Sequence, residues 1–109
     1  MFFMNSGFTN TYTPQIQNGV KAELLQHNFI HSATTMYRKE IFEKLGGFDE
    51  TLPDSEEYEF NLRCLNAGFK LGYCNSILAI YRRHGEQQTV ILGGKQLLNT
   101  SKRIADKYR

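Results

Sequence analysis

The sequence contains no apolar stretch approaching the roughly 18–20 residues that a helix needs to cross a bilayer, which argues against a membrane-spanning helix. Its two cysteines, Cys64 and Cys74, are too few for a metal site by themselves or for a disulfide-stabilised mini-protein, so we expect two reduced thiols. There is also no internal repeat, no low-complexity tract and no glycine-rich phosphate loop. These absences leave an ordinary globular domain as the class of protein to consider.

The composition fits such a domain. Hydrophobic residues make up 40% and charged residues 22% of the 109 residues, close to the averages for folded soluble domains. Charge is distributed unevenly, because residues 1–20 carry none and all 13 Lys+Arg and 11 Asp+Glu lie between Lys21 and Arg109, for a net charge of +2. We expect a single domain over residues 1–109, which begins with an extended or partly disordered segment and ends in a helix over 95–109.

Hydrophobic periodicity predicts both helices and strands. Apolar residues at helical spacing predict four helices, over residues 20–29, 39–45, 54–67 and 95–109. Runs rich in β-branched and aromatic residues predict three strands, over residues 29–37, 70–74 and 77–81. This alternation predicts an α/β fold, or α+β if the strands pair antiparallel, with a short mixed sheet flanked by helices.

The third predicted helix begins with several acidic side chains. At about 100° per residue, Glu56, Glu59 and Arg63 share one face, which we expect to be solvated, and Glu59 and Arg63 have the favourable i,i+4 order for an ion pair. Glu57 lies on another, more apolar face near Asn61 and Cys64, where a carboxylate suits a general base at the edge of a cleft. Glu57 also follows Asp54 by three residues, so this pair could instead close a capping box. Spacing alone favours capping and leaves both roles open.

A second concentration of polar side chains follows the last predicted strand. Arg82 and Arg83 supply two guanidinium groups, which bind phosphate oxygens in a forked geometry, so they are candidates for holding a diphosphate. His84 is a candidate metal ligand, although no second ligand lies at short spacing. The commoner interpretation of such a triplet is a solvated strand end.

The C-terminal helix is rich in cations. It could present a basic face to an anionic membrane surface or to nucleic acid. Its charged residues are Lys95, Lys102, Arg103, Lys107 and Arg109, against Asp106. The net charge of only +2 favours an ordinary solvated helix face, and no stripe of alternating basic and aromatic residues supports nucleic-acid binding. We therefore expect no nucleic-acid partner.

Four motifs occur in a familiar order over about half of the chain. They are Thr-Met-Tyr-Arg at 35–38, Leu-Gly-Gly-Phe-Asp-Glu at 45–50, Glu-Glu-Tyr-Glu-Phe followed by Leu-Arg at 56–63, and Ala-Gly-Phe-Lys-Leu-Gly-Tyr at 67–73 followed by Tyr-Arg-Arg-His at 81–84. In this order they resemble the C-terminal half of family 2 glycosyltransferases, which are inverting nucleotide-sugar enzymes of the GT-A fold. Each motif is weak singly, and the four in register are fairly specific.

The resemblance implies roles for five residues. Glu57 holds the position of the acid that deprotonates the acceptor hydroxyl, where the family usually has Asp, and Glu56 holds the supporting acid position. The Tyr-Arg-x-His segment lies near the donor diphosphate in the family, which implies a phosphate role for Arg82 and Arg83 and a place near the metal for His84. The resemblance shifts the balance for Glu57 from capping towards the general base.

The resemblance also shows what these residues lack. The family holds a divalent metal, Mn²⁺ or Mg²⁺, through an Asp-x-Asp triplet in its nucleotide-binding half, and no Asp-x-Asp occurs in the 109 residues. We therefore expect the acceptor-side part of a glycosyltransferase of polysaccharide or glycolipid synthesis, inactive alone and with no tightly bound metal. The alternative is a non-catalytic interaction module with the same half-fold.

Partners and location follow from the same resemblance. It implies a nucleotide-sugar donor and a glycan or lipid-linked acceptor for the intact enzyme. Because nucleotide-sugars are cytosolic, we expect a cytoplasmic protein, with peripheral contact at the inner face of the membrane as an extension. A sheet cut at this point would leave unpaired strand edges, which invite pairing with a second copy, so we also expect a homo-oligomer.

Overall fold

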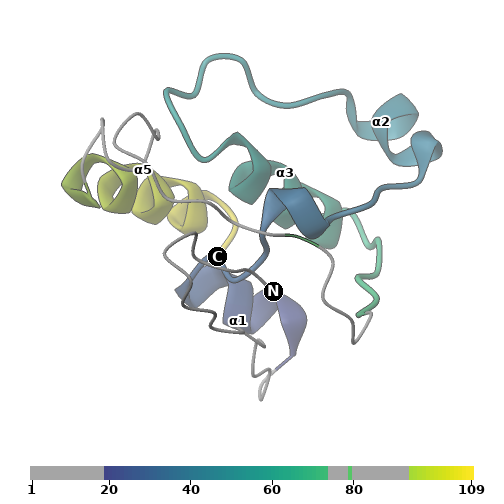
Figure 1. Cartoon of the computed structure of the whole chain (residues 1–109), viewed down its shortest axis with the longest axis horizontal. Helices are drawn as coiled ribbons and strands as arrows, with labels where there is room; N and C mark the ends of the chain where they lie inside the picture. The colour runs from purple at the N-terminus through teal and green to yellow at the C-terminus, as the bar shows by residue number, and fades with distance from the viewer. Residues whose placement is uncertain (1–18, 74–78, 80–93) are drawn as a thin grey trace.

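The computed structural model describes residues 19–73, 79 and 94–109, and all regular secondary structure within this part of the chain is helical (Figure 1). The elements are α1 (Val20–Gln26), the single-turn 3₁₀ helix η1 (Ser32–Thr34), α2 (Lys39–Leu45), α3 (Glu56–Asn66) and α5 (Gly94–Lys107). None of these helices is both long enough and apolar enough to cross a membrane.

Helix α3 lies at the centre and packs against α1, α2 and α5 (Figure 1). Because neighbours surround it on several sides, its buried residues are not confined to one stripe, and Tyr58, Phe60 and Leu62 are each at most 2% exposed. Leu24 of α1 and Ile104 of α5 join Tyr58 and Leu62 in one core cluster. This core fixes α3, and with it the acidic first turn, against three neighbouring helices.

Tyr58 links α3 to the end of α1 through a buried hydrogen bond. Its hydroxyl donates to the backbone oxygen of Leu24 at 2.6 Å. That carbonyl belongs to the last turn of α1, where carbonyl groups have no partner within the helix. The bond therefore satisfies a polar group that the core would otherwise leave unpaired.

We expect Tyr58→Phe to lower the free energy of unfolding by about 1–3 kcal/mol, because the Leu24 carbonyl would stay buried without a donor. Urea denaturation of the wild-type and variant chains measures this difference. Tyr73→Phe, which removes a hydroxyl from a side chain that is 59% exposed, is the matched control and should be nearly neutral. Equal stability of all three proteins would contradict the assignment.

Glycine ends two of the helices. Helix α2 stops at Gly46, which has φ 77°, and Gly68 follows the end of α3 with φ 96°. Both angles lie in the left-handed region, which glycine adopts without the steric penalty of a Cβ atom. The predicted bounds of α2 are confirmed at both ends, and those of α3 to within two residues.

The predicted α/β or α+β class is wrong, because the part of the chain that the structure describes contains helices and no sheet. The strand expected over 29–37 is interrupted by η1, where the hydroxyls of Thr34 and Thr35 both donate to the backbone oxygen of His31, at 2.8 and 2.9 Å. Such local bonds give Thr-rich segments an alternative to strand pairing. Residues 70–73 form no strand, and the strand expected over 77–81 lies outside the described residues apart from Ala79.

The start of α3 also differs from the predicted capping box. Ser55 is the N-cap residue, with φ 61°, and neither its side chain nor that of Asp54 caps the helix. Asp54 is 1% exposed and instead accepts hydrogen bonds from Ser55 Oγ at 2.8 Å and from Thr100 Oγ1 of α5 at 3.4 Å. Asp54 therefore ties the start of α3 to α5, and Glu57 is not part of a capping box.

Candidate functional site

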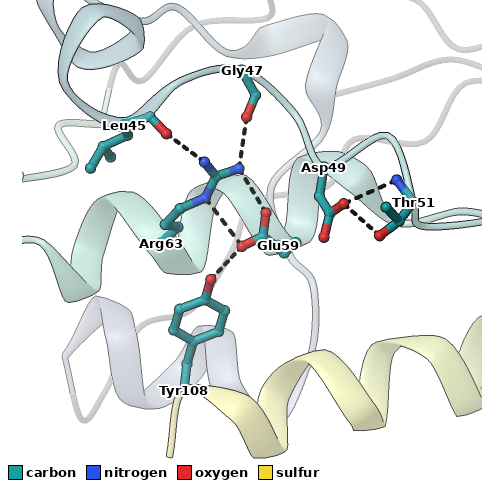
Figure 2. A network of polar contacts seen from close by, with 7 residues as sticks. All are labelled: Leu45, Gly47, Asp49, Thr51, Glu59, Arg63 and Tyr108. Atoms are coloured by element: carbon teal, nitrogen blue, oxygen red, sulfur yellow. Dashed lines mark hydrogen bonds and ion pairs between the residues drawn. The ribbon is translucent and has the colours of Figure 1, made fainter.

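Arg63 connects α3 to the turn that follows α2 (Figure 2). Its guanidinium group donates to the backbone oxygens of Leu45 at 2.7 Å and Gly47 at 2.8 Å. The same group forms a two-point ion pair with Glu59, at 2.8 and 3.2 Å. The i,i+4 pairing that the sequence predicts is therefore confirmed, and it also anchors the Gly-Gly turn.

The face that carries Glu59 is not solvated, so that prediction is wrong. Glu59 is only 3% exposed, because the turn after α2 and the end of α5 cover it. The hydroxyl of Tyr108 donates to Glu59 Oε2 from α5's side (Figure 2). Burial, followed by the bond to Glu59 and its charge, raises the pKa of Tyr108 to about 12. These contacts make the Arg63–Glu59–Tyr108 network structural.

An open depression of about 490 Å³ lies beside this network, between the turn after α2 and the end of α5. Its lining includes Asp49, Arg63 and Lys107. Asp49 Oδ1 accepts hydrogen bonds from the hydroxyl of Thr51 at 2.6 Å and its backbone N–H at 3.0 Å, and these bonds lower the pKa of Asp49 (Figure 2). Asp49 is therefore held as a carboxylate, and it is oriented by the turn rather than by a partner across the depression.

The opposite side of α3 holds a second polar group around Tyr37. The hydroxyl of Tyr37 donates to Asn61 Oδ1 at 2.5 Å. Burial raises the pKa of Tyr37 to about 12, and the charges of Cys64 and Glu57 add to this effect. The amide Nδ2 of Asn61 is buried and has no hydrogen-bond partner among the residues that the structure describes. Glu57, Asn61 and Cys64 therefore share the face of α3 that the sequence predicts for them.

Glu56 and Glu57 stand side by side in the first turn of α3, and both are partly buried. Among the described residues, no hydrogen bond or ion pair engages either carboxylate. This distinguishes them from Glu59, whose carboxylate is used by Arg63 and Tyr108. Two of the acids at the start of α3 are thus available for chemistry, and the third is committed to the fold.

Tyr37 belongs to a cluster of four aromatic rings. Phe60 is fully buried and stacks on Phe42 with ring centroids 5.0 Å apart, while Tyr37 and Phe48 meet the Phe60 ring edge-on, each at 5.2 Å. The rings come from α2, the segments on either side of it, and α3. Such edge-to-face packing restricts ring orientation, so the Tyr37 hydroxyl has a defined position near Glu57.

The remaining predicted site residues lie outside the described residues. Arg82, Arg83 and His84 belong to this group, so their proximity to Glu57 stays a prediction. Within residues 19–73, 79 and 94–109, no three His, Cys, Asp or Glu side chains gather as a metal site would require. Tyr37 is not predictable as a site residue from its own sequence neighbours, although the four-residue spacing of Glu57 and Asn61 marks the helix face that it contacts.

We expect the chain to lose stability in alkali. A tyrosine whose pKa rises from 10 to about 12 on folding holds its proton more tightly in the folded chain, so its contribution is full below pH 10 and falls as pH approaches 12. Urea midpoints measured from neutral pH upward should decline above pH 10 for the wild type. Tyr37→Phe/Tyr108→Phe should decline less steeply, and parallel curves would refute the prediction.

Comparison with known proteins gives one informative similarity. Over 58 residues the chain is 33% identical to the O-antigen chain rhamnosyltransferase WbaN of Salmonella anatum. The match indicates a relation to a glycosyltransferase. It covers 53% of this chain and 18% of the rhamnosyltransferase, so the aligned stretch spans less than a fifth of that relative.

The other comparisons add no assignment. No protein family model matches the chain, and no solved structure matches it. The resemblance to glycosyltransferases is therefore confirmed at the level of a related transferase, while membership of family 2 stays a prediction. The GT-A expectation of a sheet is not met by the part of the chain that the structure describes.

Proposed function

We propose that this chain is the acceptor-side part of an inverting, nucleotide-sugar-dependent glycosyltransferase of family 2 that acts in polysaccharide or glycolipid synthesis. The observation that carries this proposal is the 58-residue similarity to an enzyme named for rhamnosyl transfer to O-antigen chains. The order of the four sequence motifs supports it, and so does the carboxylate of Glu57 in the first turn of α3, which no other described residue engages.

Glu57 is the proposed general base. It takes the proton from an acceptor hydroxyl as that oxygen bonds to the anomeric carbon of the donor sugar, and the bond from this carbon to the diphosphate breaks on the opposite face. Proton transfer from an oxygen acid requires a carboxylate that no cation already holds. Glu57 meets that requirement among the described residues, whereas Glu59 does not. Glu56 is proposed as the supporting acid.

The residues proposed for the donor side of the reaction lie outside the part of the chain that the structure describes. Arg82 and Arg83 are proposed to contact the donor diphosphate, and His84 to lie near the metal. A divalent ion, Mn²⁺ or Mg²⁺, supplies charge to the departing diphosphate when it is bound. The described residues offer no group of ligands that fits this ion, so no step assigned to Glu57 involves it.

The surroundings of the enzyme are proposed on the same basis. A nucleotide-sugar donor places the reaction in the cytoplasm, with a glycan or lipid-linked acceptor. The expected homo-oligomer stays a prediction. That prediction rests on unpaired strand edges, and the described residues contain no strand to provide them.

A graft into the related enzyme tests the proposal. Residues 32–89, which contain all four motifs, would replace the aligned stretch of the Salmonella rhamnosyltransferase, and rhamnosyl transfer would be measured with purified protein. Retained transfer supports the acceptor-side role of this segment. A graft that folds, by its thermal unfolding transition, but transfers nothing would favour the alternative of a non-catalytic interaction module.

A further inference from the structure

The small net charge of the chain conceals two regions of opposite sign. Residues 39–59 contain eight acids and two lysines, whereas residues 94–109 contain five cations and one acid, Asp106. Their formal charges are therefore 2 − 8 = −6 and 5 − 1 = +4. The first region covers α2, the turn after it and the start of α3, and the second region is α5 with its two following residues.

The two regions meet at the depression that Asp49, Glu50 and Glu59 line together with Lys107. Helices α2 and α5 pack on different sides of α3, with α2 and α5 at opposite ends of the view in Figure 1. An anionic surface would attract α5 and repel the acidic region, so the charge distribution selects one orientation. A chain whose +2 charge was spread evenly would have no such preference.

Helix α5 is amphipathic, and its outer side is basic. Ile104 and Ala105 are buried against the core. Lys102, Arg103 and Lys107 are exposed within about 140° of arc, and the same arc contains the exposed Asp106. We call these three residues the basic face of α5. None of them forms an ion pair in the described part of the chain, whereas the neighbouring Arg109 is paired with Asp106 at 3.0 Å.

An exposed leucine adjoins the basic face. Leu98 lies one turn before Lys102 and is 69% exposed, although the same helix buries other apolar residues. An apolar side chain beside lysine and arginine is the arrangement of helices that lie in a membrane interface, where the cations meet lipid phosphates and the apolar group enters the headgroup layer. The one aromatic ring at this end, Tyr108, faces Glu59, so the basic face offers no platform for stacking nucleic-acid bases.

We propose that the basic face of α5 docks this chain on an anionic phospholipid bilayer, with Leu98 at the headgroup boundary. Helix α2, with Glu40 and Glu43, then lies on the other side of α3 from the membrane. This inference rests on charge and exposure and does not depend on glycosyl transfer. It would hold for the full chain even if the proposed transferase function failed.

Co-sedimentation of the full chain with vesicles tests the proposal. We expect binding to phosphatidylcholine vesicles that contain phosphatidylglycerol, no binding to phosphatidylcholine alone, and release at high salt. The triple variant Lys102→Gln/Arg103→Gln/Lys107→Gln should bind the anionic vesicles on the order of a hundredfold more weakly, since each cation near such a surface raises the affinity roughly fivefold. Leu98→Ser should weaken it further, because an apolar contact is lost.

The matched control removes the same charge elsewhere. Arg38, Lys39 and Lys70 are exposed and lie outside α5, so Arg38→Gln/Lys39→Gln/Lys70→Gln should keep most of the binding. Equal losses in the two triple variants would overturn the proposal, because net charge alone would then explain binding. Failure of the wild-type chain to bind the anionic vesicles would overturn it too, as would tighter binding to an RNA oligonucleotide than to these vesicles. Circular dichroism would verify that the variants stay folded.

Discussion

Replacing Glu57 with glutamine is expected to lower the turnover of the active graft by about 10²–10⁴-fold, the usual contribution of a positioned general base. The amide keeps the shape of the side chain and removes its ability to accept the acceptor proton. Because no described hydrogen bond or ion pair depends on Glu57, folding should be unaffected. The measurements are kcat with a saturating acceptor and the thermal unfolding midpoint of the same preparation.

Two further variants separate a base from a general need for negative charge. Glu57→Asp should retain much of the activity, since the proposed family usually has Asp at this position. The kcat of this variant should still fall at low pH, whereas the kcat of Glu57→Gln should lose that dependence on pH. Glu56→Gln removes the neighbouring carboxylate and should have a smaller effect on kcat. A larger loss in Glu56→Gln than in Glu57→Gln would reassign the base to Glu56.

Glu59→Gln is expected to lower the free energy of unfolding by about 3 kcal/mol. The variant leaves the Arg63 charge without its carboxylate in a partly buried site and weakens the acceptor for Tyr108. This loss is at the low end of the range for breaking a buried ion pair, because the Arg63 side chain is 24% exposed and water screens part of its charge. Urea denaturation at neutral pH gives the value.

The exposed ion pair of the same chain is the natural control. Asp106 Oδ1 and Arg109 Nε lie 3.0 Å apart, and both side chains are 57% exposed. Exposed ion pairs contribute little, so Asp106→Asn should change the free energy of unfolding by less than about 1 kcal/mol. A Glu59→Gln effect no larger than that of Asp106→Asn would show that the network in Figure 2 does not stabilise the fold.

Local patterns in the sequence predicted the helices well. Helix α2 has the predicted bounds, because its apolar residues recur at helical spacing and Gly46 supplies the left-handed residue that ends it. The pairing of Glu59 with Arg63 was likewise readable from i,i+4 spacing. These features depend on residues within about a turn of one another, so periodicity contains the information.

The errors concern contacts between distant segments. Tyr108 reaches Glu59 across 49 residues, and nothing in the periodicity of α3 indicates that α5 will bury that face. Asp54 looked like a helix cap, yet it accepts a bond from Thr100, 46 residues away. The strand predicted over 29–37, by contrast, failed for a local reason, since threonine is β-branched but also has a hydroxyl that can bond to the backbone.

Within the part of the chain that the structure describes, Glu57 has no hydrogen bond or ion pair, and the sequence predicts this only in part. Spacing placed it on the face of α3 with Asn61, and the structure brings Tyr37 to that face. Whether Glu57 capped the helix depended on where Asp54 pointed, which the packing of α5 decides. The resemblance to glycosyltransferases favoured the catalytic role before that packing was known.

Arg63 and Glu59 together connect the turn after α2 to the end of α5. One planar group holds two carbonyls of the turn after α2 and the carboxylate that Tyr108 also contacts. A lysine ammonium, a single point with no fork, cannot reach these acceptors together. Detachment of the end of α5 would therefore loosen the turn as well, so the two segments open as one cooperative unit with a shared free energy of local unfolding.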